Sequence, residues 1–169
     1  MKRTIRKTNN TILMAVEGYT EEAFVKHIKN FYCTRDSLVS ITVKNAKGKG
    51  PDGIVDTIKS AKRSGQYNLV GAVFDGDITP SATTSKWLSD NKVELFISDP
   101  AIEATLLSIL KSRIGRNTKE CKALLGALCP GDPTERLFYE KNFPKSLLDS
   151  SRASTARLND LIIFMTRKA

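Results

Sequence analysis

The sequence is poor in the residues that build zinc sites and disulfide frameworks. Its 169 residues include one histidine, one tryptophan and three cysteines. A single histidine, His27, excludes a His-rich zinc site and argues against a Ser-His-Asp triad. The cysteines are odd in number and have no CxxC or Cys/His spacing. We therefore expect reduced thiols in a cytoplasmic protein.

Long apolar runs are also lacking. No stretch approaches the roughly 18 residues that a membrane span needs, and the first residues contain no apolar segment typical of a signal peptide. We therefore expect neither a membrane protein nor a secreted one. Hydrophobic residues still make up 40% of the chain, which is too much for a disordered chain and enough for one packed core.

The charge balance is strongly basic. Lys and Arg number 27 against 18 Asp and Glu, which gives a formal net charge of +9. Such a surface favours a polyanion, most often nucleic acid, as partner. The basic residues gather in an N-terminal arm (residues 1–10) and in two later runs. The candidate nucleic-acid contacts in those runs are Lys44, Lys47, Lys49, Lys111, Arg113 and Arg116. A solvated loop and a solvated helix face are the alternative interpretations.

Strand and helix patterns alternate along residues 11–111. Short apolar runs predict strands at 11–16, 38–43, 68–74 and 93–98. Capping residues and helical spacing of apolar positions predict helices that begin near Thr20, Asp52, Thr79-Pro80 and Pro100. This alternation predicts an α/β fold, a Rossmann-like parallel sheet of about four strands between helices.

From residue 112 the strand signal disappears. We expect a C-terminal helical extension over 112–169 that packs on the same domain. Its helices are predicted to begin at Asn117, near Asp132, and at Ser154.

Acidic residues follow three of the predicted strands. Glu17 ends the first strand, Asp75 and Asp77 end the third, and Glu103 lies just after the fourth. Ligands of open parallel sheets bind beyond the carboxyl ends of the strands. Clustered carboxylates repel unless a cation bridges them, and oxygen ligands without His or Cys select Mg²⁺ or Mn²⁺. Two Asp at a spacing of two would project the same way from an extended strand end, which suits one cation.

Each acid also has a purely structural interpretation. The Asp-Gly-Asp segment could be only a turn, and Glu21 and Glu103 could be favoured in a helix's first turn by the helix dipole. Glu17 has no such explanation, because it closes an apolar strand and precedes a glycine. For Glu17 the functional interpretation is therefore favoured.

These motifs carry a family resemblance. Glu17-Gly18-x-x-Glu21 after one strand, with an Asp-Gly-Asp segment after a later one, resembles the TOPRIM domain of topoisomerases, primases and small nucleases. The first motif is similar to the OLD-family nucleases in particular. The segment Pro100-x-x-Glu103 resembles small RloB-like proteins, which are linked to prokaryotic defence loci. The resemblance covers residues 11–111.

The resemblance implies a role for each acid. Glu17 would be the general acid/base and a metal ligand, Asp75 and Asp77 the Mg²⁺-binding pair, and Glu21 a ligand of a second metal. Glu103 would match the additional acid of the RloB-like proteins. The implied activity is Mg²⁺-dependent phosphodiester cleavage of nucleic acid, in which two cations neutralise the phosphate and activate the nucleophile. The sequence departs from many TOPRIM domains in lacking a glycine shortly after the second Asp.

A non-catalytic nucleic-acid-binding or complex-forming TOPRIM-like subunit is the alternative. Topoisomerase activity is disfavoured because the chain has no room for a tyrosine-bearing cleavage domain, and primase activity because it has no zinc-binding region. OLD-like enzymes usually carry an ATPase in the same chain, and none is recognisable here. We therefore expect the protein to act alone, as a homo-oligomer, or with a separate ATPase partner.

Overall fold

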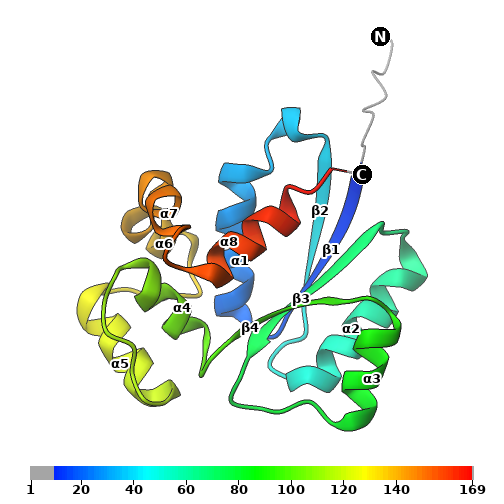
Figure 1. Cartoon of the computed structure of the whole chain (residues 1–169), viewed down its shortest axis with the longest axis horizontal. Helices are drawn as coiled ribbons and strands as arrows, with labels where there is room; N and C mark the ends of the chain where they lie inside the picture. Colours follow the sequence, from blue (N-terminus) through cyan, green and yellow to red (C-terminus); the bar gives the residue numbers. More distant parts are fainter. Residues whose placement is uncertain (1–9, 169) are drawn as a thin grey trace.

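The structure, a computed structural model, describes residues 10–168. Its four strands are β1 (Asn10–Val16), β2 (Val39–Asn45), β3 (Leu69–Asp75) and β4 (Glu94–Ser98). They form one sheet in the order β2-β1-β3-β4, and every neighbouring pair is parallel. The α/β fold with a four-stranded parallel sheet, predicted from the alternation of apolar runs, is therefore confirmed (Figure 1).

A helix follows each strand. These are α1 (Tyr19–Tyr32), α2 (Gly50–Ser64), α3 (Ala82–Asp90) and α4 (Ile102–Ile109), with a short 3-10 helix at Arg35–Ser37. The remaining helices are α5 (Thr118–Leu128), α6 (Arg136–Asn142), α7 (Lys145–Ser151) and α8 (Ala156–Met165). In the described residues no helix is long and apolar enough to cross a bilayer.

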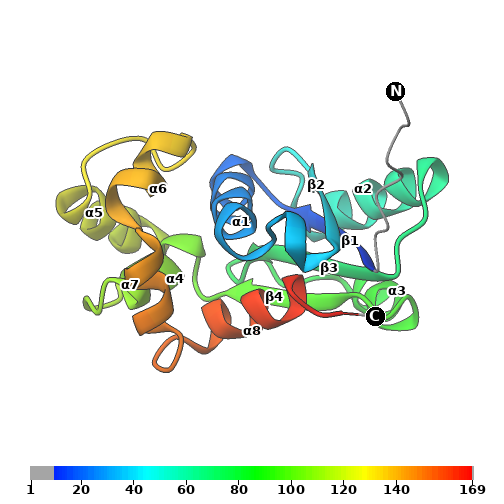
Figure 2. The ribbon, with the colours of Figure 1, turned by 90° about the horizontal axis from the view of Figure 1, so that it is seen from above.

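The sheet is covered on both faces. Ile12, Met14 and Val16 of β1 point to the face packed by α1 and α8. Leu13 and Ala15 point to the opposite face, which α2 and α3 cover (Figures 1 and 2). Burial on both faces explains why β1 is a continuous apolar run in the sequence rather than an alternating one.

The C-terminal helices are tied to α1. The Tyr139 hydroxyl of α6 donates to the Thr20 carbonyl at 3.2 Å, and His27 Nε2 donates to the Phe143 carbonyl at 2.8 Å. Burial lowers the pKa of His27, while the Phe143 carbonyl opposes that effect. His27 therefore has a structural role, and these bonds hold α6 against the first turn of α1.

Some boundaries differ from the predicted ones. Ser81, not Thr79, caps α3, and its hydroxyl accepts the Thr84 N–H at 3.1 Å. Helix α7 has no counterpart among the predicted helices, and α8 follows Thr155. The predicted basic arm lies outside the described residues except for Asn10, which is the first residue of β1.

Candidate functional site

The carboxyl ends of β1 and β3 lie side by side, with Val16 paired to Val73. The backbone N–H of Glu17 donates to the Val73 carbonyl at 3.0 Å. The Glu17 side chain turns toward the same edge, where Oε2 accepts the backbone N–H of Asp75 at 3.1 Å. The structure thus brings Glu17 and Asp75 together between β1 and β3, where the order of the strands reverses and ligands of such sheets bind.

A second contact joins this pair to α4. Asp75 Oδ1 accepts the backbone N–H of Ile102, the first residue of α4, at 2.8 Å. The next residue, Glu103, is only 4% exposed. Its Oε2 is buried and has no hydrogen-bond partner within residues 10–168. A buried acceptor without a donor costs about 1–3 kcal/mol, so this oxygen is suited to a ligand that supplies a proton donor or a positive charge.

Glu21 is the fourth carboxylate and comes from the first turn of α1. It is 5% exposed, and its Oε2 accepts the backbone N–H of Gly18 at 2.9 Å. A Cβ at position 18 would lie 2.9 Å from that oxygen, so the glycine leaves room for the carboxylate. The Glu-Gly-x-x-Glu motif therefore has a local structural basis: the second Glu reaches back to cap the helix that the glycine starts.

The acidic cluster, defined as Glu17, Glu21, Asp75 and Glu103, is electrostatically strained. Burial and then the charges of Glu21, Glu103 and Glu17 raise the pKa of Asp75 from 3.8 to about 8, although the Ile102 N–H opposes the rise. Burial, followed by the charges of Glu17 and Glu103, also raises the pKa of Glu21, while backbone hydrogen bonds lower it. Protons or a divalent cation would relieve this repulsion.

Asp77 lies in a turn rather than in β3. The strand β3 ends at Asp75, and Asp77 is an exposed residue in the turn that follows. Its Oδ2 accepts the Thr118 hydroxyl at the long distance of 3.4 Å. The expectation that two Asp project together from an extended strand end therefore does not describe Asp77, because the chain turns between the two residues.

The donor chemistry of the acidic cluster fits a hard divalent cation. Its ligands are all carboxylate oxygens, and the buried Glu103 Oε2 is without a donor. Glu17, Glu21 and Asp75 each give one oxygen to a backbone N–H, which leaves the other oxygen of each for a cation. Among residues 10–168, however, no three acidic, Cys or His side chains are already grouped to hold a metal ion.

The first basic run lies next to Glu17. The Gly48 N–H donates to the Glu17 carbonyl at 2.7 Å, which places the loop carrying Lys47 and Lys49 at the same edge of the sheet. Both lysines are exposed. Lys44 belongs to β2 rather than to the loop that was predicted to carry it.

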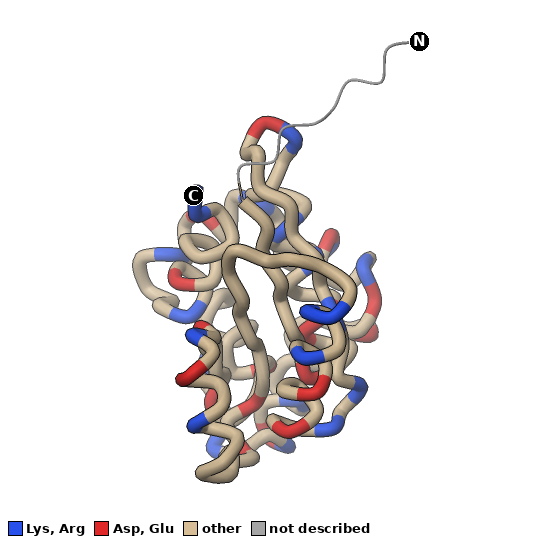
Figure 3. Tube along the Cα trace, turned by 90° about the vertical axis from the view of Figure 1, so that its right-hand side faces the viewer, with Lys and Arg blue, Asp and Glu red and all other residues tan. Residues whose placement is uncertain are grey.

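The second basic run is partly neutralised. Arg113 and Arg116 pair with Glu120 at 3.0 and 3.4 Å, and Lys111 is exposed just after α4. Across the molecule, basic and acidic positions are interspersed along the chain (Figure 3). The loop between β2 and α2 is therefore the basic segment most directly placed beside the acidic cluster.

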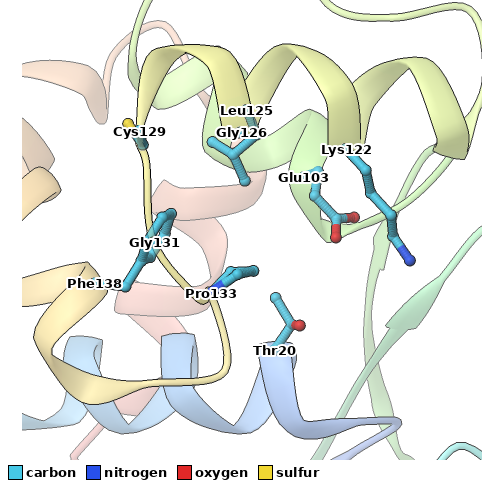
Figure 4. Close-up of a pocket in the computed structure, with 9 residues that line it drawn as sticks. All are labelled: Thr20, Glu103, Lys122, Leu125, Gly126, Cys129, Gly131, Pro133 and Phe138. Carbon is cyan, nitrogen blue, oxygen red and sulfur yellow. The ribbon is translucent and has the colours of Figure 1, made fainter.

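A cavity of about 300 Å³ opens beside Glu103. It lies between the start of α1, α5 and the connection from α5 to α6; Thr20 and Glu103 point toward it, and Lys122 lies at its edge (Figure 4). Their meeting could not be predicted from the sequence, because they come from three separate helices. The one local signal is Gly126, which also lines the cavity and interrupts an otherwise apolar and helix-favouring stretch.

Comparison with known proteins finds no significant match. The chain matches no protein-family model, and neither a curated protein nor a solved structure shows significant similarity to it.

Proposed function

We propose that the protein cleaves phosphodiester bonds in nucleic acid with the help of Mg²⁺ or Mn²⁺ at the acidic cluster. The observation that carries the proposal is the pair of contacts through Asp75. One joins it to Glu17 and the other to the start of α4. Carboxylates from β1, β3, α1 and α4 thereby gather at the ligand-binding edge of a parallel sheet.

The residues have distinct parts in this proposal. Glu17 and Asp75 would hold the cation, with Glu21 and Glu103 as further ligands. When bound, a divalent cation supplies charge neutralisation at the phosphate and an activated water. Glu21 is suited to take a proton, since burial, followed by the charges of Glu17 and Glu103, raises its pKa. Asp77 would become a ligand only if the backbone of the turn after β3 changed its conformation.

The substrate class follows from charge. The net charge of +9 favours a polyanion, and Lys47 and Lys49 lie at the edge of the sheet that holds Glu17. Lysines at this position would contact phosphates on either side of the scissile bond. Arg113 and Arg116 are weaker candidates because Glu120 already pairs with both.

The motifs quoted above support the further proposal that the protein is a TOPRIM protein of the OLD-like or RloB-like kind. The proposed setting is the cytoplasm of a prokaryote, in a defence system. There the protein would act alone, as a homo-oligomer or with a separate ATPase.

A second candidate function is a nucleic-acid-binding or complex-forming subunit without turnover. The observation that favours it is the turn at Asp77: β3 ends at Asp75, so the two aspartates do not project together from an extended strand. Incubating the protein with single- and double-stranded DNA and RNA, in Mg²⁺, Mn²⁺ or EDTA, separates the candidates. Binding without cleavage in every metal condition would favour the subunit.

The site is tested by Glu17→Gln, which can keep the hydrogen bond to the Asp75 N–H but removes the charge. Metal-dependent cleavage should fall by at least about 100-fold, because the cation that neutralises the phosphate would lose a charged ligand. Asp160→Asn, which removes an exposed acid of α8, is the matched control and should cleave like the wild type. Equal loss in both variants, or unchanged cleavage in Glu17→Gln, would contradict the assignment.

A further inference from the structure

The cavity beside Glu103 is walled by apolar groups and has two charged groups at one side. Leu125 of α5 and Phe138 of α6 line it, and both are buried. Gly131, in the connection between these helices, lies against the Phe138 ring, since a Cβ there would be 3.2 Å from it. The Phe138 ring also packs edge-on against Tyr139, at 5.2 Å between centroids. These contacts give the apolar wall a fixed shape.

The polar side of the cavity is made by Glu103 and Lys122. Glu103 Oε2 is buried and lacks a hydrogen-bond donor, and Lys122 is exposed at the mouth (Figure 4). Within the described part of the chain, no ion pair engages Lys122. The same Glu103 belongs to the acidic cluster, and Asp75 accepts the backbone N–H of the residue before it. A ligand in the cavity would therefore lie next to a phosphate bound at the cluster.

Gly126 is the least expected residue of the wall. It lies inside α5, where glycine costs about 1 kcal/mol relative to alanine. A Cβ at this position would meet nothing within 4 Å, and its φ is not in the left-handed region. Neither packing nor backbone conformation accounts for the glycine. The absence of a side chain at position 126 leaves this part of the cavity open.

We propose that this cavity receives an unpaired nucleobase of the substrate, beside the phosphodiester held at the acidic cluster. The inference rests on the proposed function and specifies its substrate as single-stranded or locally unpaired nucleic acid. Enzymes that act on an extruded base hold it between apolar or aromatic side chains and read its edge by hydrogen bonds. Here Leu125 and Phe138 supply the apolar contacts, and the Glu103 carboxylate, which lines the cavity, accepts a base N–H.

The carboxylate also determines which bases fit. Adenine, cytosine and guanine present an exocyclic amino group, which can donate a hydrogen bond to a carboxylate oxygen. Thymine and uracil flank their single N–H with carbonyl oxygens that would face the negative charge of Glu103. Lys122 at the mouth is placed to meet a backbone phosphate of the same nucleotide. Glu103 has two carboxylate oxygens, so one can accept a hydrogen bond from the base while the other contacts the cation at the acidic cluster.

The test fills the cavity without substituting any residue of the acidic cluster. Gly126→Leu places a side chain in open space and adds a better helix former, so its melting temperature should not fall. Ala127→Leu, an exposed neighbour that does not line the cavity, is the matched control. Binding of labelled single-stranded deoxycytidine and abasic decamers is measured by fluorescence anisotropy in EDTA, so that no cleavage intervenes.

Gly126→Leu should weaken binding of the deoxycytidine decamer by about tenfold, the scale of one lost base contact, and leave the abasic decamer unchanged. Ala127→Leu should change neither. If both leucine variants bind alike, or if Gly126→Leu weakens both decamers equally, the base pocket is refuted. Cleavage by the wild type in Mg²⁺ is a separate readout, so loss of the pocket and failure of the nuclease proposal give different results.

Glu103→Gln provides a second variant that does not depend on filling the cavity. The wild type should prefer deoxycytidine over thymidine decamers in EDTA. Glutamine offers both a donor and an acceptor, so the variant should bind the two decamers about equally. A wild type that binds both equally, or a preference unaffected by Glu103→Gln, would overturn the assignment of Glu103 to the base.

Discussion

Replacing Asp75 by asparagine should stabilise the metal-free protein at about pH 8. Burial and the neighbouring carboxylates raise the Asp75 pKa from 3.8 to about 8. The folded state therefore holds a proton that the unfolded state releases between these values. Stability from this group is fully present below pH 3.8 and is lost as the pH rises through about 8. Asparagine carries no such proton, and its Oδ1 can still accept the Ile102 N–H.

The size of the effect follows from the change in pKa. A rise from 3.8 to about 8 corresponds to about 5–6 kcal/mol if fully expressed. Asp75 is only half-buried, so solvent screening reduces the expected gain to about 2–3 kcal/mol. The gain should reach its full size above about pH 8 and should disappear below about pH 3, where aspartate is protonated in both states.

Urea unfolding in EDTA, followed by circular dichroism at several pH values, measures this gain directly. Asp160→Asn, on the exposed side of α8, should leave the free energy of unfolding within about 0.5 kcal/mol of the wild type at every pH. A variant Asp75→Asn that is no more stable than the wild type at about pH 8 would refute the reasoning. It would mean that burial and the neighbouring carboxylates do not penalise the charge of Asp75.

Two further predictions concern substrate contact and the shape of the cluster. The double variant Lys47→Ser, Lys49→Ser should weaken nucleic-acid binding and reduce the slope of log affinity against log salt by about 2, measured by titrations at several salt concentrations; an unchanged slope would remove these lysines from the interface. Gly18→Ala should keep the melting temperature, since Gly18 has an extended backbone. It should lower metal-dependent cleavage about tenfold, because the new Cβ would displace the Glu21 carboxylate; wild-type cleavage rates would contradict this.

The sheet was predictable because its strands are apolar runs that end at acidic or turn residues. What the sequence does not contain is the order of the strands. The closeness of Glu17 and Asp75 depends on β1 and β3 being neighbours, and that is decided by helix packing on the two faces. The motif spacing placed both acids at strand ends, and the strand order brought them into contact.

Two differences from the predicted geometry have local causes. A spacing of two residues makes Asp75 and Asp77 project together only if the strand continues, and β3 ends at Asp75. The last two residues of β2, Lys44 and Asn45, are polar, so the apolar pattern predicts a strand that ends too early. The cavity beside Glu103 was not predictable at all, because it forms only when α5 and α6 pack over the first turn of α1.

The central claim is that carboxylates from β1 and β3 share a divalent cation. Anomalous diffraction from crystals soaked in Mn²⁺ tests it most directly, because it locates the ion itself. The account predicts an anomalous peak within coordination distance of both Glu17 and Asp75, about 2.0–2.6 Å, and none at that place in crystals of Glu17→Gln. A peak elsewhere only, or none at saturating Mn²⁺, would contradict the claim.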